Sequence, residues 1–218
     1  MNLTLIKKSV SVALVATLVT GGVFALIEPS TASAVTDTKS VVVTLNVTSG
    51  VSLSQPANST LSQALGIAAN GAIGTTTWTV NTNSATGYTL TVQATSTPAM
   101  NSTTTVNSIF DYQTGTPNTW SATSGAAYFG YSAFGSDVPT GTWGTAPGSV
   151  CYGGTVNATS TTLKYKGFTT SPVQVASRSS TTTFSGVTTT VCYAVEQNNF
   201  YIPAGNYQAT ITATATAS

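Results

Sequence analysis

The chain has 218 residues, of which only 5% are charged, and it contains no histidine. Its 6 lysines and arginines nearly balance its 5 aspartates and glutamates, so the sequence offers no basic patch for nucleic acid and no acidic run for calcium. We therefore expect no nucleic-acid partner, no metal and no cofactor. The aromatic and β-branched content is too high for a disordered chain and favours a folded protein rich in strands.

The segment 1–34 predicts a secretory signal peptide. Lys7 and Lys8 precede a long apolar run, and an A-x-A arrangement that ends at Ala34 gives a cleavage site. An uncleaved membrane anchor is the alternative. With cleavage, the sequence predicts a secreted, extracellular protein of the cell surface that keeps no membrane segment and whose single domain spans 35–218.

After this segment, apolar and polar residues alternate with the period of two that predicts β-strands. The first strand is expected over 39–47. Its inward row is Val41, Val43, Leu45 and Val47. The stretch 60–74 contains several glycines, which favour a loop or an irregular strand over a short helix.

Two further strands are predicted over 75–83 and 88–95. Their inward rows are Trp78 and Val80 in the first and Tyr88, Leu90 and Val92 in the second. The five residues 83–87, which begin with the last residue of the first strand and end in Gly87, connect the two strands. This pattern predicts a β-hairpin.

The middle of the chain is rich in aromatic residues placed between glycines, threonines and prolines. Trp120, Tyr131 and Trp143 are candidates for a ligand-binding face, because aromatic rings stack well on the faces of sugars. The alternative is that these rings fill the core and cover the edges of sheets. Sequence alone does not separate the two interpretations.

Later strands are predicted over 148–156, 162–168, 171–177 and 188–197, and the last one lies within 206–218. Short strands, frequent turns and no intervening helices predict an all-β fold, an antiparallel β-sandwich of jelly-roll-like type. The last strand either completes this sandwich or pairs with another copy of the chain.

Cys151 and Cys192 are the only cysteines. In an exported chain they predict one disulfide, with two free buried thiols as the alternative. Their similar surroundings, SVCYGG and TVCYAV, suggest that both cysteines lie on strands. Without histidine, two cysteines do not complete a metal site.

Catalysis needs groups that titrate or act as nucleophiles near the working pH, and this sequence has few of them. The carboxylates after residue 34 are far apart in the chain: Asp37, Asp111, Asp137 and Glu196. A glycosidase would need two of them brought together. A covalent Lys–Asn cross-link beside a buried acid would instead use one of Lys39, Lys164 and Lys166. The leading interpretation is a protein that is not an enzyme.

Two parts of the chain resemble a known family. The motifs are Trp78, Thr79 and Val80; Gly87, Tyr88, Leu90 and Val92; and Pro203, Ala204, Gly205 and Tyr207. They are similar to motifs of secreted bacterial β-sandwich domains related to the WxL surface proteins, and of Thr-rich surface proteins of candidate-phylum bacteria. The resemblance covers the two ends of the chain after the signal peptide and leaves out the middle.

This resemblance implies a surface-exposed, non-catalytic protein without a known small-molecule site. The wall-binding members of the family carry a second W-x-L motif in the last strand, where this chain has Thr210, Ile211 and Thr212. The resemblance therefore does not extend to peptidoglycan binding.

Together these observations predict a secreted structural or adhesive protein of the cell surface. Its expected partners are other surface proteins or copies of itself, joined into a filament through terminal β-strands. The alternative is a module that binds glycans or a host surface through Trp120, Tyr131 and Trp143.

Overall fold

The computed structural model describes residues 37–152 and 157–218, and the chain divides into two units after Leu45. The folded unit spans Asn46–Ser218. The predicted signal peptide, residues 1–34, lies outside the described residues. Among the helices that the described ranges contain, none is long and apolar enough to cross a membrane.

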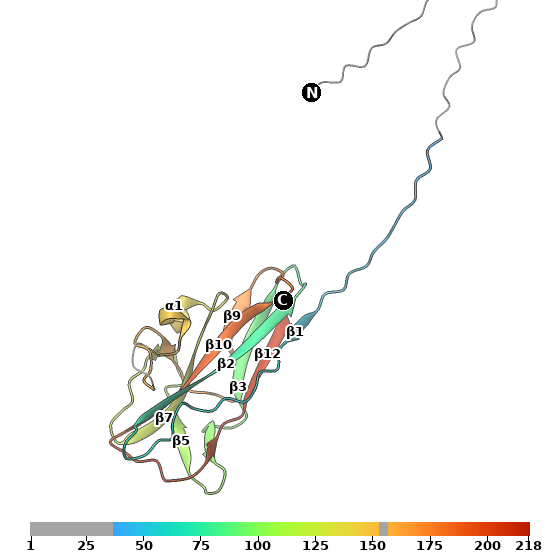
Figure 1. Ribbon diagram of the computed structural model, residues 1–218. Helices are drawn as coiled ribbons and strands as arrows, with labels where there is room; N and C mark the ends of the chain where they lie inside the picture. Colours follow the sequence, from blue (N-terminus) through green and yellow to red (C-terminus); the bar gives the residue numbers. More distant parts are fainter. Residues whose placement is uncertain (1–36, 153–156) are drawn as a thin grey trace, which may run out of the picture. The chain divides into compact units, whose positions relative to one another are not determined.

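The folded unit consists of strands joined by loops, with one turn of α-helix and one of 3-10 helix (Figure 1). Its elements are β1 (Val51–Leu53), β2 (Gly71–Thr82), β3 (Tyr88–Ala94), β4 (Met100–Ser102), β5 (Ser108–Asp111), β6 (Asn118–Thr119), β7 (Ala126–Gly135), α1 (Thr140–Trp143), η1 (Pro147–Ser149), β8 (Lys164–Tyr165), β9 (Val173–Arg178), β10 (Val187–Asn198), β11 (Tyr207–Gln208) and β12 (Ile211–Ala217).

The strands form two main sheets. The large sheet has the order β1-β2-β10-β7-β5-β4-β11, and the small sheet has the order β12-β3-β9. Strands β6 and β8 form a separate antiparallel pair. Most neighbouring strands pair antiparallel, and β5 pairs parallel with β7. The prediction of an all-β fold built mainly from antiparallel strands is confirmed.

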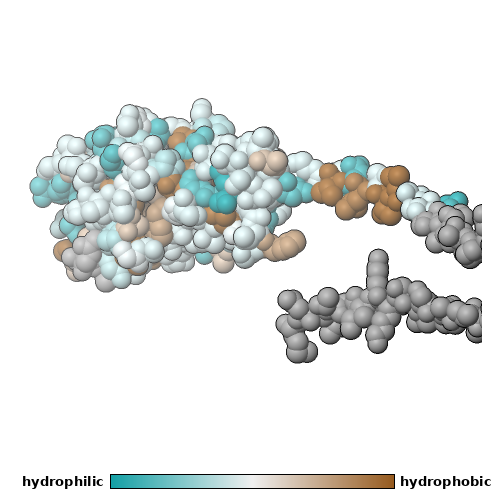
Figure 2. Space-filling view, turned by 90° about the horizontal axis from the view of Figure 1, so that it is seen from above, coloured by the Kyte–Doolittle hydropathy of each residue, from teal (hydrophilic) through white to brown (hydrophobic). Residues whose placement is uncertain are grey.

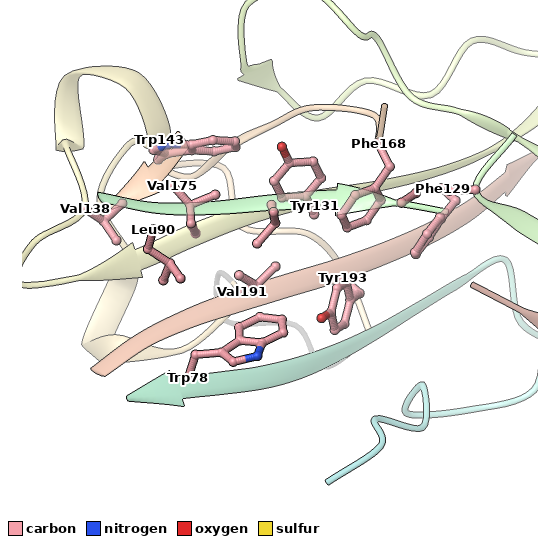
Figure 3. Close-up of a cluster of buried hydrophobic side chains, with 14 of the residues drawn as sticks. Trp78, Leu90, Phe129, Tyr131, Val138, Trp143, Phe168, Val175, Val191 and Tyr193 are labelled. Carbon is pink, nitrogen blue, oxygen red and sulfur yellow. The ribbon is translucent and has the colours of Figure 1, made fainter. Parts of the chain in front are cut away.

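The main core lies between the inner faces of the two sheets, as expected for a β-sandwich. The large sheet contributes Trp78 and Val80 from β2, Phe129 and Tyr131 from β7, and Val191 and Tyr193 from β10; the small sheet contributes Leu90 and Val92 from β3 and Val175 from β9. Figure 3 shows the labelled members of this set, such as Trp78, Leu90 and Tyr131, converging between the sheets. The alternation predicted over 75–83 and 88–95 is therefore confirmed by the burial of every inward residue.

A second, smaller core covers the outer face of the large sheet. Ile73 of β2 and Cys192 and Ala194 of β10 face it from the sheet, and Leu163 and Tyr165 pack on them from the segment that follows η1. The predicted disulfide between Cys151 and Cys192 is confirmed and lies in this core. It ties the long connection between β7 and β9 to the middle of the large sheet.

The predicted strand over 148–156 is not found. Cys192 lies in β10, but Cys151 follows η1 and belongs to no strand, and residues 153–156 lie outside the described residues. Gly148 has a positive φ of 57° inside η1. Such a backbone conformation is incompatible with an extended strand at the start of the predicted segment.

The predicted hairpin between 75–83 and 88–95 is also wrong. Both strands exist as β2 and β3, but β2 pairs with β1 and β10 in the large sheet, whereas β3 pairs with β12 and β9 in the small sheet. The connection over Asn83–Gly87 therefore carries the chain from one sheet to the other. A pattern of alternating residues shows which face of a strand is buried. The pattern is the same whether the two strands pair in a hairpin or lie in different sheets, so it does not show the pairing.

The strand predicted over 39–47 does not form. These residues are neither paired nor helical, and the first strand is β1 at Val51. The row that was predicted to face inward is exposed instead: Val41 87%, Val43 89%, Leu45 84% and Val47 71%. Alternation makes a segment competent to form a strand, but a strand also needs a neighbouring strand to pair with, and this segment pairs with none of the described strands.

Candidate functional site

The carboxylates of the folded unit are held in separate places. Asp137 pairs with Arg178, with Oδ1 to Nη1 at 3.2 Å, whereas Glu196 accepts a hydrogen bond from Nε1 of Trp120. Asp111 accepts a hydrogen bond from the backbone N–H of Ala99 at 3.0 Å. Each acid has a different set of partners, so the described residues do not present the pair of carboxylates that glycoside hydrolysis requires.

The lysines of the folded unit bind backbone groups. Nζ of Lys164 donates to the carbonyl of Gly141 at 2.9 Å, and Nζ of Lys166 donates to the carbonyl of Gly115 at 2.8 Å. Lys39 forms an exposed ion pair with Asp37 at 2.8 Å. None of these lysines is placed next to Asp111 or Glu196 by the described contacts, as a Lys–Asn cross-link would need.

Asp111 has the most unusual environment among the acids. Burial raises the pKa of its carboxyl above the usual value of 3.8, and the hydrogen bond from Ala99 opposes this rise. Its second oxygen, Oδ2, is buried without a hydrogen-bond partner among the described residues. A buried oxygen without a partner disfavours the charged form, so Asp111 is a cost to folding near neutral pH.

We expect Asp111→Asn to raise the free energy of unfolding at pH 7 and to leave it nearly unchanged near pH 3. The unfolded chain ionises Asp111 first, so wild-type stability falls as the pH rises from 3.8 through the raised pKa of the folded state. The Asn oxygen can still accept the Ala99 N–H, and the variant carries no charge. Urea titrations of both proteins at the two pH values test this, and an equal difference at both would contradict it.

The three candidate aromatic residues are part of the folded core. Tyr131 is fully buried and Trp143 is 1% exposed, with their ring centroids 5.2 Å apart (Figure 3). Trp120 is half-buried and stacks on Tyr112 with ring centroids 4.3 Å apart. Tyr131 and Trp143 have no ring face to offer a sugar, so they supply none of the exposed rings that the glycan-binding alternative needs.

An open depression of about 1120 Å³ lies on the outer face of the large sheet, beside the disulfide. Hydroxyl side chains dominate its lining, including Thr75, Thr77 and Thr190, and Tyr152 borders it. Thr77 and Thr190 hydrogen-bond to each other at 2.9 Å across β2 and β10. These groups can form hydrogen bonds, but they include no base that would activate a hydroxyl as a nucleophile.

The most distinctive surface is the segment that precedes the fold, residues 39–47, called the arm below. Figure 2 shows a brown, apolar band in this segment. Side chains of this kind are normally buried in a soluble protein, and a contiguous exposed row of them marks an interaction site. The row is clearest on one side of the alternation, where every second residue from Val41 to Val47 is apolar.

The chain enters the fold from the arm at a well-defined point. Asn83 donates its side-chain N–H to the carbonyl of Thr48 at 2.8 Å and accepts the N–H of Gly50 at 2.6 Å. The backbone N–H of Asn83 also donates to the carbonyl of Gly50 at 3.3 Å. Asn83 therefore holds the segment just before β1.

At the edge of the small sheet, β12 pairs with β3 on one side only. Its inward residues, Ile211, Ala213, Ala215 and Ala217, are only half-buried, although the corresponding row of β3 is buried. The last strand is predicted from the sequence as a candidate for pairing with another copy. Its position as an edge strand does not follow from the sequence, because strand order depends on pairings between distant parts of the chain.

Comparison with protein-family models, with curated proteins and with solved structures finds no match to this chain.

Proposed function

We propose that this protein is a secreted, non-catalytic structural protein of the cell surface that assembles with copies of itself by strand addition. The observation that carries the proposal is the exposed arm: Val41, Val43, Leu45 and Val47 form one apolar row, opposite Val42, Thr44 and Asn46, and are 71–89% exposed. In strand addition, an extended segment joins the edge of a sheet in another subunit, where main-chain hydrogen bonds give affinity and alternate side chains give specificity.

Other features support a structural role outside the cell. The Cys151–Cys192 disulfide suits an oxidising compartment. The chain has few charges and no histidine, and its acids are not paired for acid–base chemistry. A sandwich with these properties provides a stable, inert body, and the arm supplies the connection between bodies. The resemblance to surface proteins of the WxL type agrees with this proposal.

Deletion of residues 37–47 is expected to convert a multimeric exported protein into a monomer. The wild type should form fibres in negative-stain micrographs and an SDS-resistant ladder on unboiled gels, and the deletion variant should show neither. Because the deleted side chains are exposed, the thermal unfolding midpoint of the deletion variant should stay close to that of the dissociated wild type. A wild-type protein that elutes as a monomer at micromolar concentration would refute the proposed assembly.

A further inference from the structure

The outer side of β12 carries a row of unpaired backbone groups. Thr95 donates its N–H to the carbonyl of Thr210, and Ser218 donates its N–H to the carbonyl of Gly87, at 3.1 and 3.0 Å. In an antiparallel pair, such hydrogen-bonded positions recur at every second residue. The backbone groups of Thr212, Thr214 and Thr216 therefore face β3, and those of the residues between them face away from it.

The residues whose backbone faces away from β3 are Ile211, Ala213, Ala215 and Ala217. Among the described residues, no backbone–backbone hydrogen bond outside the strand pairs involves them, and β12 has no second neighbour in its sheet. We call this row the open edge of β12. An unprotected strand edge of this length is a template for pairing with another chain, and charged residues, prolines or bulges normally protect it. The open edge has none of these features.

The side chains of the open edge also leave room for larger neighbours. Ile211, Ala213 and Ala215 face the main core but are only partly buried, and all but one are alanines. Strand β1 lies close to β12 without pairing with it, and the partly buried side chains of Val51, Leu53, Leu61 and Leu65 also border the main core. The half-burial of the inward row of β12 shows that the apolar interior is incompletely covered there, and one more strand with larger side chains would cover it better.

The arm has the complementary pattern. Its odd-numbered row from Val41 to Val47 consists of valines and a leucine, whereas its even-numbered row contains Ser40, Val42, Thr44 and Asn46. A strand with this alternation can bury its wholly apolar row beside the small side chains of β12 and keep its more polar row in solvent. The arm is also long enough to run along the whole of β12.

We propose that the arm of one copy adds to the open edge of β12 in a second copy, as a fourth strand of the small sheet. This inference rests on the proposed function and identifies the strand edge that receives the arm. The arm would hydrogen-bond to the backbone of Ile211, Ala213, Ala215 and Ala217, with the Val41–Val47 row turned toward the core. Each copy then donates one arm and accepts one, and repetition of this head-to-tail contact builds a filament or a ring.

A second copy is favoured over the same chain by the way in which the chain enters the fold. Asn83 holds Thr48 and Gly50, and the adjacent Ser84 donates its hydroxyl to the carbonyl of Ser218 at 2.9 Å. The entry point of the arm is thus at the end of β12. To lie along its own β12, the chain would have to reverse in a tight turn directly before Thr48, and that turn would use residues of the Val41–Val47 row.

Two matched substitutions test the donor side in the exported full-length protein. Val43→Asp places a charge in the row that faces the core, and Val42→Asp places the same charge in the row that faces solvent. Both valines are 89% exposed, so neither change disturbs the folded unit. We expect Val43→Asp to abolish the SDS-resistant ladder and Val42→Asp to retain it. Equal loss with both variants would overturn the assignment of the buried row.

Hydrogen exchange tests the acceptor side. In the Val43→Asp protein, the amides of Thr212, Thr214 and Thr216 should be protected by β3, while those of Ala213, Ala215 and Ala217 exchange quickly. A synthetic peptide of residues 39–48 should slow exchange at these alanines by about tenfold or more, with little change at the threonines. The same peptide with Val43→Asp is the control and should have no effect.

The outcomes separate the inference from the proposed function. If the wild type assembles but the peptide leaves the alanine amides of β12 unprotected, assembly stands and β12 is not the acceptor. If the wild type is monomeric and its own β12 amides are already protected, the arm folds back on the same chain, and the second-copy assignment is wrong. A wild type that neither assembles nor protects these amides refutes both.

Discussion

Removal of the Cys151–Cys192 disulfide by a double substitution to alanine is expected to lower the free energy of unfolding by about 4 kcal/mol. The bond closes a loop with a sequence separation of 41, and closing a loop of this size removes much of the conformational freedom of the unfolded chain. Since small domains are stable by only about 5–15 kcal/mol, this loss is a large part of the total. Urea denaturation of the wild-type and double-alanine proteins measures it.

The location of the bond predicts where its loss is felt. Cys151 lies in the long connection between β7 and β9, outside any strand, and Cys192 lies in the middle of β10. Without the bond, the second core should loosen first, with faster amide exchange around Leu163 and Tyr165, because no strand of either main sheet holds this connection at Cys151. The main core between the two sheets should keep its protection at neutral pH.

Reduction of the wild-type protein under denaturing conditions, followed by refolding with a thiol present, is the matched control for the double-alanine variant. Both samples lack the cross-link, and only the variant lacks the sulfur atoms. Similar stability in the two samples would assign the loss to the cross-link itself. A loss below about 1 kcal/mol in both would show that the unfolded chain is already restricted in this region.

The sequence predicts which face of each strand is buried, but it does not predict which strands pair with each other. In β2 and β3, every residue expected to face inward is buried, because the period of two directly reports a half-buried strand. The hairpin between them was wrong, because the same period results when the chain crosses from one sheet to the other. Strand order depends on pairing between segments far apart in the chain, such as β2 with β10, and local pattern carries no information about it.

The same limit explains the outcome for the candidate site. Tyr131 and Trp143, which the sequence left open as core residues or as a binding face, are buried, because aromatic residues suit both and only the three-dimensional packing decides between them. The alternation of the arm predicts an ordinary strand. In the structure the first strand is β1, which begins at Val51 and occupies the end of the large sheet, so the arm is not part of either main sheet.

A second large effect is expected at the contact that joins β9, β3 and the loop after β7. Asp137 accepts hydrogen bonds from the hydroxyl of Tyr88 at 2.8 Å and from Nη1 of Arg178 at 3.2 Å. Its own carbonyl accepts the N–H of Ser177 at 3.0 Å. The side chain of Asp137 is only 8% exposed, and Tyr88 is fully buried. Water therefore has little access to the Asp137 carboxylate or the Tyr88 hydroxyl, and each relies on the other as a hydrogen-bond partner.

The Tyr88 hydroxyl is kept in its neutral, donating form. Burial raises the pKa of Tyr88 above its usual value of 10.0, and the hydrogen bond to Asp137 adds to this rise. If Asp137 is removed, the hydroxyl is left in the core without this acceptor. Leaving a buried donor unpaired costs about 1–3 kcal/mol, and breaking a buried ion pair costs more.

We therefore expect Asp137→Ala to lower the free energy of unfolding by about 3 kcal/mol, since Arg178 is partly solvated and recovers some of its loss in water. Tyr88→Phe removes only the hydroxyl and should cost about 1 kcal/mol. In the background of Tyr88→Phe, Asp137→Ala should cost less than it does alone, because no hydroxyl remains to be left unpaired. Strictly additive losses in this double-mutant cycle, measured by urea denaturation, would show that the hydrogen bond does not couple the two residues.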